Sequence, residues 1–314
     1  MNDLEDSVSR NFKISDNPLN DLRQILVNRI AKWTLNLEQV VLPIPGMEFH
    51  KYTSPTVPVN ALHEPSICLV VQGSKRVQLN EAEYIYDANH YLLTSVNLPI
   101  IASIVEASPE LPFFGITWTL DLRVAAQLIA DSDLPPQRVT KTESGVGLGA
   151  VTPELLDIYI RVLDMLDTPE DIPILSPLIH KELLYRLLVG DQGDRLRQIT
   201  QAESHSQQIS KAIDWLLVHY NESVKMEKLA ARIGMSKSTF NHHFRLVTAM
   251  SPLQFQKWMR LHEARKLMLT EHQDAASAGL MVGYESPSQF SREYSRQFGA
   301  PPKQDIQRLR QMDT

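Results

Sequence analysis

Residues 225–247 read KMEKLAARIGMSKSTFNHHFRLV and predict two short helices joined by a tight turn. Leu229 and Ile233 give the first helix an apolar side, and Gly234 can take the left-handed conformation that ends it. Ser236 is suited to cap the next helix, because its side chain can accept a free backbone N–H. This pattern is the outline of a helix-turn-helix.

The second helix of this stretch has one apolar side and several polar ones. Phe240 and Phe244 lie four residues apart and would bury it. The polar residues of this helix are Lys237, Ser238, Asn241, His242, His243 and Arg245. Such side chains suit base edges and phosphates, but a solvated helical hairpin has the same pattern, so one copy leaves both interpretations open.

A second copy of the pattern occupies residues 274–298, DAASAGLMVGYESPSQFSREYSRQF. Val282 and Gly283 repeat the apolar residue and the glycine that end the first helix. Ser286 with Gln289 has the spacing of a capping box, which predicts the start of a second presenting helix. The repetition favours DNA binding over a solvated hairpin.

Between the copies, Ser251 and Pro252 predict a helix start, and the helical pattern continues to about Thr270. A helix of this length is roughly 28 Å long, at ~1.5 Å for each residue. One turn of B-DNA is ~34 Å, so one chain could place two recognition helices in successive major grooves. We therefore expect residues 205–314 to bind DNA as a monomer.

Several runs of the sequence resemble the AraC family of bacterial transcription regulators. In the C-terminal part these runs are GMSKSTFNHHF, MSPLQFQKWMRLHEARKLML and VGYESPSQFSREYSRQFGAPP. In the N-terminal part they are HEPSICLVVQGSK, TWTLD and IHKELLYRLLVGDQGDRLRQI. One departure is Ala249, where many members have Gly after the first recognition helix, and it leaves open how that helix ends.

The resemblance, together with positions near the helix N-termini, implies a set of DNA-contacting residues. The base-reading residues would be Ser238, Asn241 and His242 in one major groove and Ser288, Gln289 and Arg292 in the next. The phosphate-binding residues would be Lys237, Arg245, Arg260 and Arg296. Double-stranded promoter DNA and RNA polymerase are the implied partners.

The charge distribution agrees with DNA binding by the C-terminal part alone. The 314 residues carry a formal net charge of −6. Residues 205–314 hold 15 Lys and Arg against 10 Asp and Glu, which is +5 and leaves −11 for residues 1–204. The cationic part is suited to a polyanion, and the acidic part should stay off DNA.

Composition indicates an ordinary globular protein of two domains. The single cysteine allows no internal disulfide, and the first 13 residues lack the apolar core of a signal peptide. No apolar stretch is long enough to span a bilayer. We therefore expect a cytoplasmic location.

The N-terminal part predicts one amphipathic helix over 19–37 and then many short strands over 40–120, punctuated by Pro and Gly. Such strands form a sandwich or small barrel, and the resemblance implies a cupin-like barrel that holds a small-molecule effector. We expect an effector pocket at Cys68, Tyr84 and Trp118, with core packing as the other interpretation of each. Cys68 could also be a reactive thiol.

Histidine spacing argues against a metal site in this barrel. His50, His63 and His90 lie far apart without an H-x-H run, so we expect neither a metal nor another cofactor. Two alternatives to a regulator stay open, namely a metal-dependent cupin enzyme and a DNA-repair protein fused to this kind of DNA-binding domain. A regulator without enzymatic activity is the favoured interpretation.

Two helices are predicted after the strands, over 153–166 and 173–189. The second is apolar on a wide face, which would be covered either by the barrel or by a second copy in a homodimer. The predicted class is thus α+β with two domains. Residues 1–190 form the acidic cupin-like sensor and dimerisation domain, 191–206 a polar linker, and 207–314 the all-α DNA-binding domain.

Overall fold

The computed structural model describes residues 18–34, 37–132, 134, 144–201 and 204–312; the segment searched for a signal peptide lies outside them. The strands are β1 (Gln39–Val41), β2 (Met47–Tyr52), β3 (Val59–His63), β4 (Ser66–Gln72), β5 (Ser74–Leu79), β6 (Ala82–Asp87), β7 (His90–Thr94), β8 (Leu98–Glu106), β9 (Phe113–Thr119) and β10 (Val146–Ala150). The α-helices are α1 (Pro18–Thr34), α2 (Leu122–Asp131), α3 (Pro153–Asp164), α4 (Ile172–Val189), α5 (Gly193–Thr200), α6 (His205–Val218), α7 (Met226–Arg232), α8 (Lys237–Thr248), α9 (Pro252–Thr270), α10 (Ala275–Met281), α11 (Pro287–Phe298) and α12 (Pro302–Met312).

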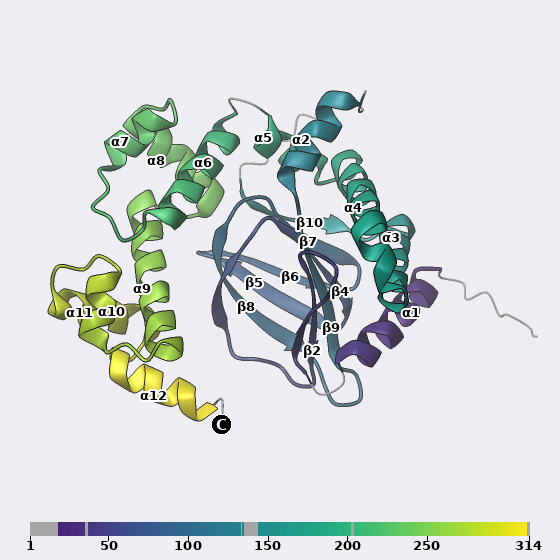
Figure 1. Ribbon diagram of the computed structural model, residues 1–314, viewed down its shortest axis with the longest axis horizontal. Coiled ribbons are helices and arrows are strands. Elements are labelled where there is room, and N and C mark those ends of the chain that lie inside the picture. Colours follow the sequence, from purple (N-terminus) through teal and green to yellow (C-terminus); the bar gives the residue numbers. More distant parts are fainter. Residues whose placement is uncertain (1–17, 35–36, 133, 135–143, 202–203, 313–314) are drawn as a thin grey trace, which may run out of the picture.

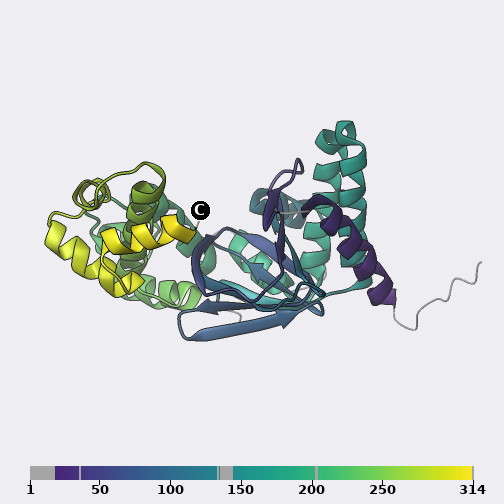
Figure 2. The same ribbon diagram turned by 90° about the horizontal axis from the view of Figure 1, so that it is seen from below.

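The strands form two antiparallel sheets at the centre of the molecule (Figure 1). The six-stranded sheet has the order β1-β2-β9-β4-β7-β10, and the four-stranded sheet has the order β3-β8-β5-β6. Helices α6 to α12 lie on one side of the sheets, and α1, α3 and α4 on the other, as the view from below also shows (Figure 2). The predicted α+β class, with strands first and a helical domain last, is confirmed.

One helical layer packs against the six-stranded sheet. Leu26 of α1, Tyr159 of α3 and Leu183 of α4 are fully buried in one apolar core with Trp118 of β9. The wide apolar face predicted for the helix over 173–189, which is α4, is therefore partly covered within the chain. In the described part of the chain, no helix is long and apolar enough to cross a membrane.

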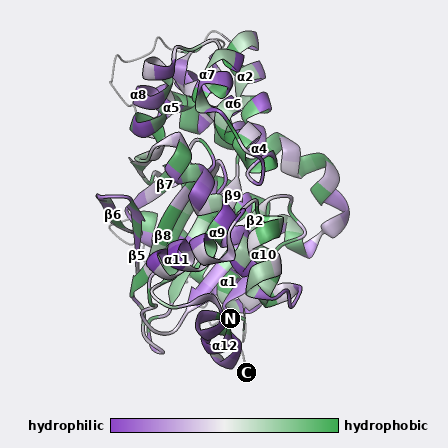
Figure 3. Ribbon diagram, turned by 90° about the vertical axis from the view of Figure 1, so that its left-hand side faces the viewer, coloured by the Kyte–Doolittle hydropathy of each residue, from purple (hydrophilic) through white to green (hydrophobic). Residues whose placement is uncertain are grey.

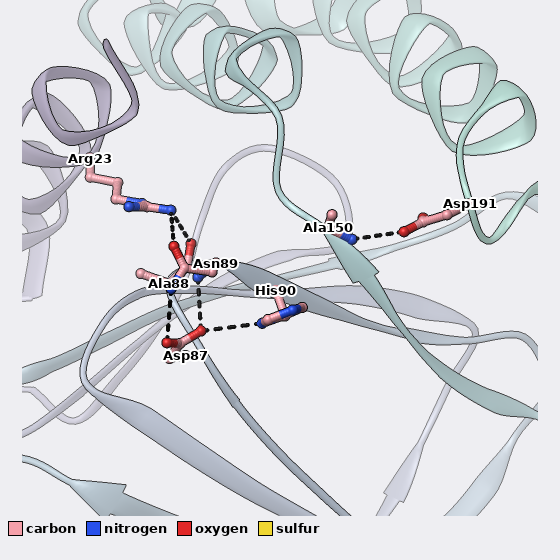
Figure 4. A network of polar contacts seen from close by, with 7 residues as sticks. All are labelled: Arg23, Asp87, Ala88, Asn89, His90, Ala150 and Asp191. Carbon is pink, nitrogen blue, oxygen red and sulfur yellow. Dashed lines mark hydrogen bonds and ion pairs between the residues drawn. The ribbon is translucent and has the colours of Figure 1, made fainter. Parts of the chain in front are cut away.

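Polar contacts fix the ends of this layer to the sheets (Figure 4). The Arg23 side chain of α1 donates to the Ala88 carbonyl at 2.7 Å and to Asn89 Oδ1 at 2.9 Å, in the turn between β6 and β7. After α4, Asp191 accepts the backbone N–H of Ala150 at 3.0 Å. The chain that leaves the layer is thus tied to the end of β10.

The predicted linker contains α5 and is packed against the rest of the chain. Leu196 and Ile199 of this helix are buried. They lie three residues apart and so give a polar-looking segment one apolar side. The connection between the two parts is therefore a helix held in place over 193–200.

The C-terminal part has the predicted pair of helix-turn-helix units, α7–α8 and α10–α11, on either side of α9. At the start of α9, Ser251 and Gln254 form a complete capping box. At the start of α11, the Ser286 side chain accepts the Gln289 backbone N–H at 3.4 Å, whereas the Gln289 side chain turns toward Glu293. Only the Ser286 half of the predicted capping box is formed.

Ala249 ends α8 in the left-handed conformation, with φ of 58°, and its N–H bonds to the Arg245 carbonyl at 2.8 Å. The helix therefore ends as it would with glycine, although the Cβ of alanine opposes this conformation. Gly299 ends α11 in the same way, with φ of 74°.

We expect Ala249→Gly to raise the free energy of unfolding by about 1 kcal/mol, because it removes the steric cost of a left-handed alanine. The measurement is urea unfolding of both proteins. The matched control is Ala300→Gly, one residue beyond the glycine that ends α11. Equal midpoints for wild type and Ala249→Gly would show that this backbone conformation carries no strain.

Candidate functional site

The first recognition helix, α8, presents its N-terminal residues to solvent. The side chains of Ser238 and His242 are exposed, and Asn241 is half-buried. Asn241 Nδ2 donates to the Lys237 carbonyl at 2.8 Å, which leaves its Oδ1 directed away from that bond. Lys237 itself forms an ion pair with Glu227 of α7. The predicted residues of this helix thus share one exposed region.

The second recognition helix, α11, has the same arrangement and is largely hydrophilic (Figure 3). Ser288, Gln289 and Arg292 are all exposed. Glu293 accepts from Gln289 Nε2 at 3.3 Å and from Lys257 Nζ at 2.9 Å. Because the amide nitrogen of Gln289 faces this carboxylate, its amide oxygen is directed outward as an acceptor.

Arg260 of α9 is engaged by the protein backbone. Its guanidinium donates to the carbonyls of Tyr220 at 2.6 Å, Glu222 at 2.8 Å and Gly283 at 3.0 Å. The first two carbonyls precede the first helix-turn-helix, and the third lies in the turn of the second. Arg260 therefore ties the two units together, whereas the sequence predicted a phosphate contact. Arg245 and Arg296 are exposed, and their contact with phosphate stays a prediction.

A buried carboxylate that the sequence did not single out holds α11 against α9 and α12. Asp305 has no solvent-exposed surface. It accepts from Tyr294 Oη at 2.8 Å, from Arg265 Nε at 2.8 Å and from Arg308 at 3.0 Å. Burial and the bond to Asp305 raise the pKa of Tyr294, which keeps its hydroxyl protonated as the donor. In the sequence, Asp305 follows two prolines by three residues, a position typical of a solvated residue in the first turn of a helix. Only the packed structure shows that this carboxylate is buried.

A cavity of about 720 Å³ lies between the two sheets. Its wall includes His50, His63, Lys75, Phe113 and Thr117. These residues come from four strands, β2 and β9 of one sheet and β3 and β5 of the other, so both sheets shape the space. A volume of this size is typical of small-molecule sites.

Two imidazoles in the cavity wall are uncharged at neutral pH. Burial, and then the positive charge of Lys75, lower the pKa of both His50 and His63 to about 3. His50 Nε2 lies 3.0 Å from Thr117 Oγ1, and Cys68 Sγ lies 3.6 Å from the same hydroxyl and 4.0 Å from His63 Nδ1. The chain thus brings together two histidines that its sequence separates.

The residues predicted for the effector pocket occupy different places. Cys68 is buried behind the cavity wall, next to His63 and Thr117. Tyr84 packs beside the core of the four-stranded sheet. Trp118 is buried in the helical layer, where its indole donates to the Pro45 carbonyl at 3.2 Å. The alternation of β9 explains this, since Thr117 and Trp118 must point to opposite faces.

No group of three or more His, Cys, Asp or Glu side chains is placed to hold a metal ion within the residues that the structure describes.

The sheets contact the first helix-turn-helix directly. Gly145, before β10, donates its N–H to the Val247 carbonyl at the end of α8 at 2.9 Å. Asn97 Nδ2 donates to Asp214 Oδ1 of α6 at 3.1 Å. One apolar core continues across this contact, from Cys68 and neighbouring sheet residues to Phe240 of α8. The cavity wall and the first recognition helix therefore belong to one packed unit.

A sheet domain with an internal cavity, followed by two helix-turn-helix units, defines a regulator-like class of DNA-binding protein. Residues 43–195 match the family model described as the AraC-type transcriptional regulator N-terminus, and residues 229–308 match a helix-turn-helix domain. The chain belongs to the AraC family of transcriptional regulators.

Individual relatives agree with this assignment. The HTH-type transcriptional regulator ExsA of Pseudomonas aeruginosa is 26% identical over 171 residues, which is 54% of this chain and 61% of that protein. The MmsAB operon regulatory protein of the same species is 31% identical over 93 residues, 30% of each chain. The chain spans less than two thirds of the length of these curated relatives.

Among solved structures, an apo form of ToxT from Vibrio cholerae has the same two-part fold. It superposes with a TM-score of 0.53 at 10% identity, covering 83% of this chain and 97% of that one. At this identity the likeness concerns the fold alone.

The placement of Arg260 leads to a prediction that separates its role from that of Arg296. Arg260→Met should lower the melting temperature and leave the salt dependence of DNA binding unchanged, because its donors bond to carbonyls. Arg296→Met, on exposed α11, should keep the melting temperature and lower the slope of log K against log salt by about 1. Thermal unfolding and DNA titrations at several salt concentrations measure both quantities. A lower slope for Arg260→Met would show that Arg260 contacts phosphate.

Proposed function

We propose that this protein is a sequence-specific regulator of transcription that acts on promoter DNA in the cytoplasm. The observation that carries the proposal is the pair of exposed, polar helix N-termini, on α8 and α11, presented by one chain and joined through α9. Ser238, Asn241 and His242 read one major groove, and Ser288, Gln289 and Arg292 read the next. Residues 207–314 then form the DNA-binding domain and contact both grooves as a monomer.

The exposed cations next to these helices supply the contacts to phosphate. Arg245 and Arg296 fill this role, and Lys237 joins them once DNA competes with its ion pair to Glu227. Arg260 contributes by holding the two units in register. RNA polymerase is the partner through which a promoter-bound regulator of this family acts.

Residues 1–190 form the sensor domain, and the cavity between its sheets takes a small-molecule effector. Ligand changes DNA binding only if it binds two states of the protein unequally. One proposed route of transmission runs through the helices of 153–189. The contacts of Gly145 with Val247 and of Asn97 with Asp214 supply a shorter route, straight from the sheets to α8 and α6.

A homodimer through α4 is part of the proposal. Ile174 and Leu178 are 70% and 62% exposed, and they lie four residues apart on one side of the helix. A second copy could cover this side, while Leu183 and Leu187 stay in the chain's own core. Dimerisation would raise the affinity for paired DNA sites through tethering.

We favour a regulator over the enzymatic alternatives. A cupin catalyst would hold its metal through several histidines, and here His50 and His63 are accompanied in the cavity by the cation of Lys75. A positive neighbour opposes the binding of a metal cation. The fused-repair alternative would use zinc-binding cysteines as well as an acceptor cysteine, and the chain has one cysteine.

The test of base reading is Arg292→Ala. We expect a loss of about 1–3 kcal/mol on a DNA site selected by the wild-type protein from a random pool, and relaxed preference at one base position, because arginine bonds guanine bidentately. Selection and titration with the variant measure both effects. The matched control is Arg296→Ala on the same helix, which should weaken all sequences alike. An equal loss for Arg292→Ala on selected and random DNA would assign it to phosphate.

The test of coupling uses the contact between sheet and helix. A ligand that stabilises the full chain should change the affinity for DNA by a factor of roughly 5 to 150, and DNA should change the affinity for ligand by the same factor. Asn97→Asp sets a second carboxylate against Asp214 and should bring both factors toward 1. Asn80→Asp, in the turn between β5 and β6, is the control. Factors of 1 in the wild type would eliminate regulation through DNA binding.

A further inference from the structure

The amino group of Lys75 is the most distinctive feature of the cavity. It lines the space from β5 and is half-buried. No hydrogen bond or ion pair joins it to any of the residues that the structure describes. A cation with reduced access to water and no counter-charge is costly, unless a ligand supplies that charge.

The inner wall around Lys75 carries donors rather than negative charge. His50 and His63 are neutral, and each can donate one ring N–H, while Thr117 adds a hydroxyl. Three acidic residues also line the cavity, away from Lys75 in hydrogen bonding and ion pairing: Glu38 and Glu64 are exposed, and Glu48 accepts from Gln39 Nε2 at 2.6 Å. The inner end thus has the chemistry of an anion site.

Apolar side chains continue from this polar end. Ile104 is the direct cross-strand neighbour of Lys75, and both face the cavity. Phe113 of β9 also lines it, with its ring 6.3 Å from that of Tyr52. A ligand that places an anionic group at Lys75 would lie with its body against these residues.

We propose that the cavity binds a small organic carboxylate, with the carboxylate at Lys75 and an apolar or aromatic body along Ile104 and Phe113. The inference rests on the proposed sensor role and specifies its ligand class. The carboxylate accepts charge-assisted bonds from Lys75 and further bonds from the imidazoles and the Thr117 hydroxyl. A neutral amide of the same shape lacks the charge.

The experiment is calorimetric titration of the full-length protein at pH 7 with four probes: octanoate, octanamide, trans-cinnamate and cinnamamide. At least one acid should bind about tenfold more tightly than its amide, the difference between a charge-assisted and a neutral hydrogen bond. Lys75→Met should remove this preference, and Lys75→Arg should keep it. Arg76→Met is the matched control, because it removes a positive charge from the opposite face of the same strand, where Arg76 pairs with Glu83.

Several outcomes would overturn the inference. These are equal binding of each acid and its amide, acid preference that survives in Lys75→Met, absence of binding by all four probes, and stabilisation by Zn²⁺ alone. Circular dichroism of Lys75→Met and Lys75→Arg establishes that both are folded. DNA titrations run in parallel keep the two proposals apart. Acid binding without any effect on DNA affinity rejects ligand regulation only, whereas DNA binding without acid preference rejects the carboxylate site only.

Discussion

The rest of the structure depends on one continuous apolar core, which joins the sheets to the first helix-turn-helix. Cys68, behind the cavity wall, and Phe240, inside α8, belong to the same set of packed residues. Packed cores rearrange between discrete arrangements more readily than they deform gradually. The cavity wall and the base of the recognition helix are therefore joined by packed side chains.

The second helix-turn-helix has a core of its own, built around Phe290 and Tyr294. Both cores share α9, and polar contacts add direction to this packing, namely the three carbonyl bonds of Arg260 and the buried Asp305. Such bonds are strongly directional, whereas apolar packing is not. The first unit is thus attached to the sheets by packing, and the second unit is aligned with the first by packing on α9 together with directed bonds.

The boundary between the two parts also contains a buried cation. Arg195 of α5 is buried, and burial lowers the pKa of its guanidinium to about 10. Its Nε donates to Gln192 at 3.2 Å, and Gln192 in turn donates to the Leu148 carbonyl of β10 at 2.6 Å. Nη1 of this guanidinium has no hydrogen-bond partner among the described residues, and a partly satisfied buried cation costs free energy.

The sequence by itself determined the elements that rest on local pattern. Repeated spacing of apolar residues, the caps at Ser236 and Ser251, and the turn glycines Gly234 and Gly283 predicted the recognition helices and α9. The sequence also predicted the α+β class, since short strands separated by Pro and Gly precede a cationic helical part. These signals lie within one or two turns of chain, so no knowledge of packing is needed to read them.

Only the tertiary structure decided which residues meet. His50, His63, Lys75 and Thr117 come from separate strands, and the sheet register brings them into one cavity while turning Trp118 away from it. The sequence predicted that Arg260 binds phosphate, whereas in the structure its guanidinium donates to the carbonyls of Tyr220, Glu222 and Gly283. The sequence predicted a linker that includes 193–200, whereas in the structure Leu196 of this segment packs in an apolar core. Contacts between distant residues depend on the whole chain being folded, because a side chain's type fixes what it can bond but not what lies beside it.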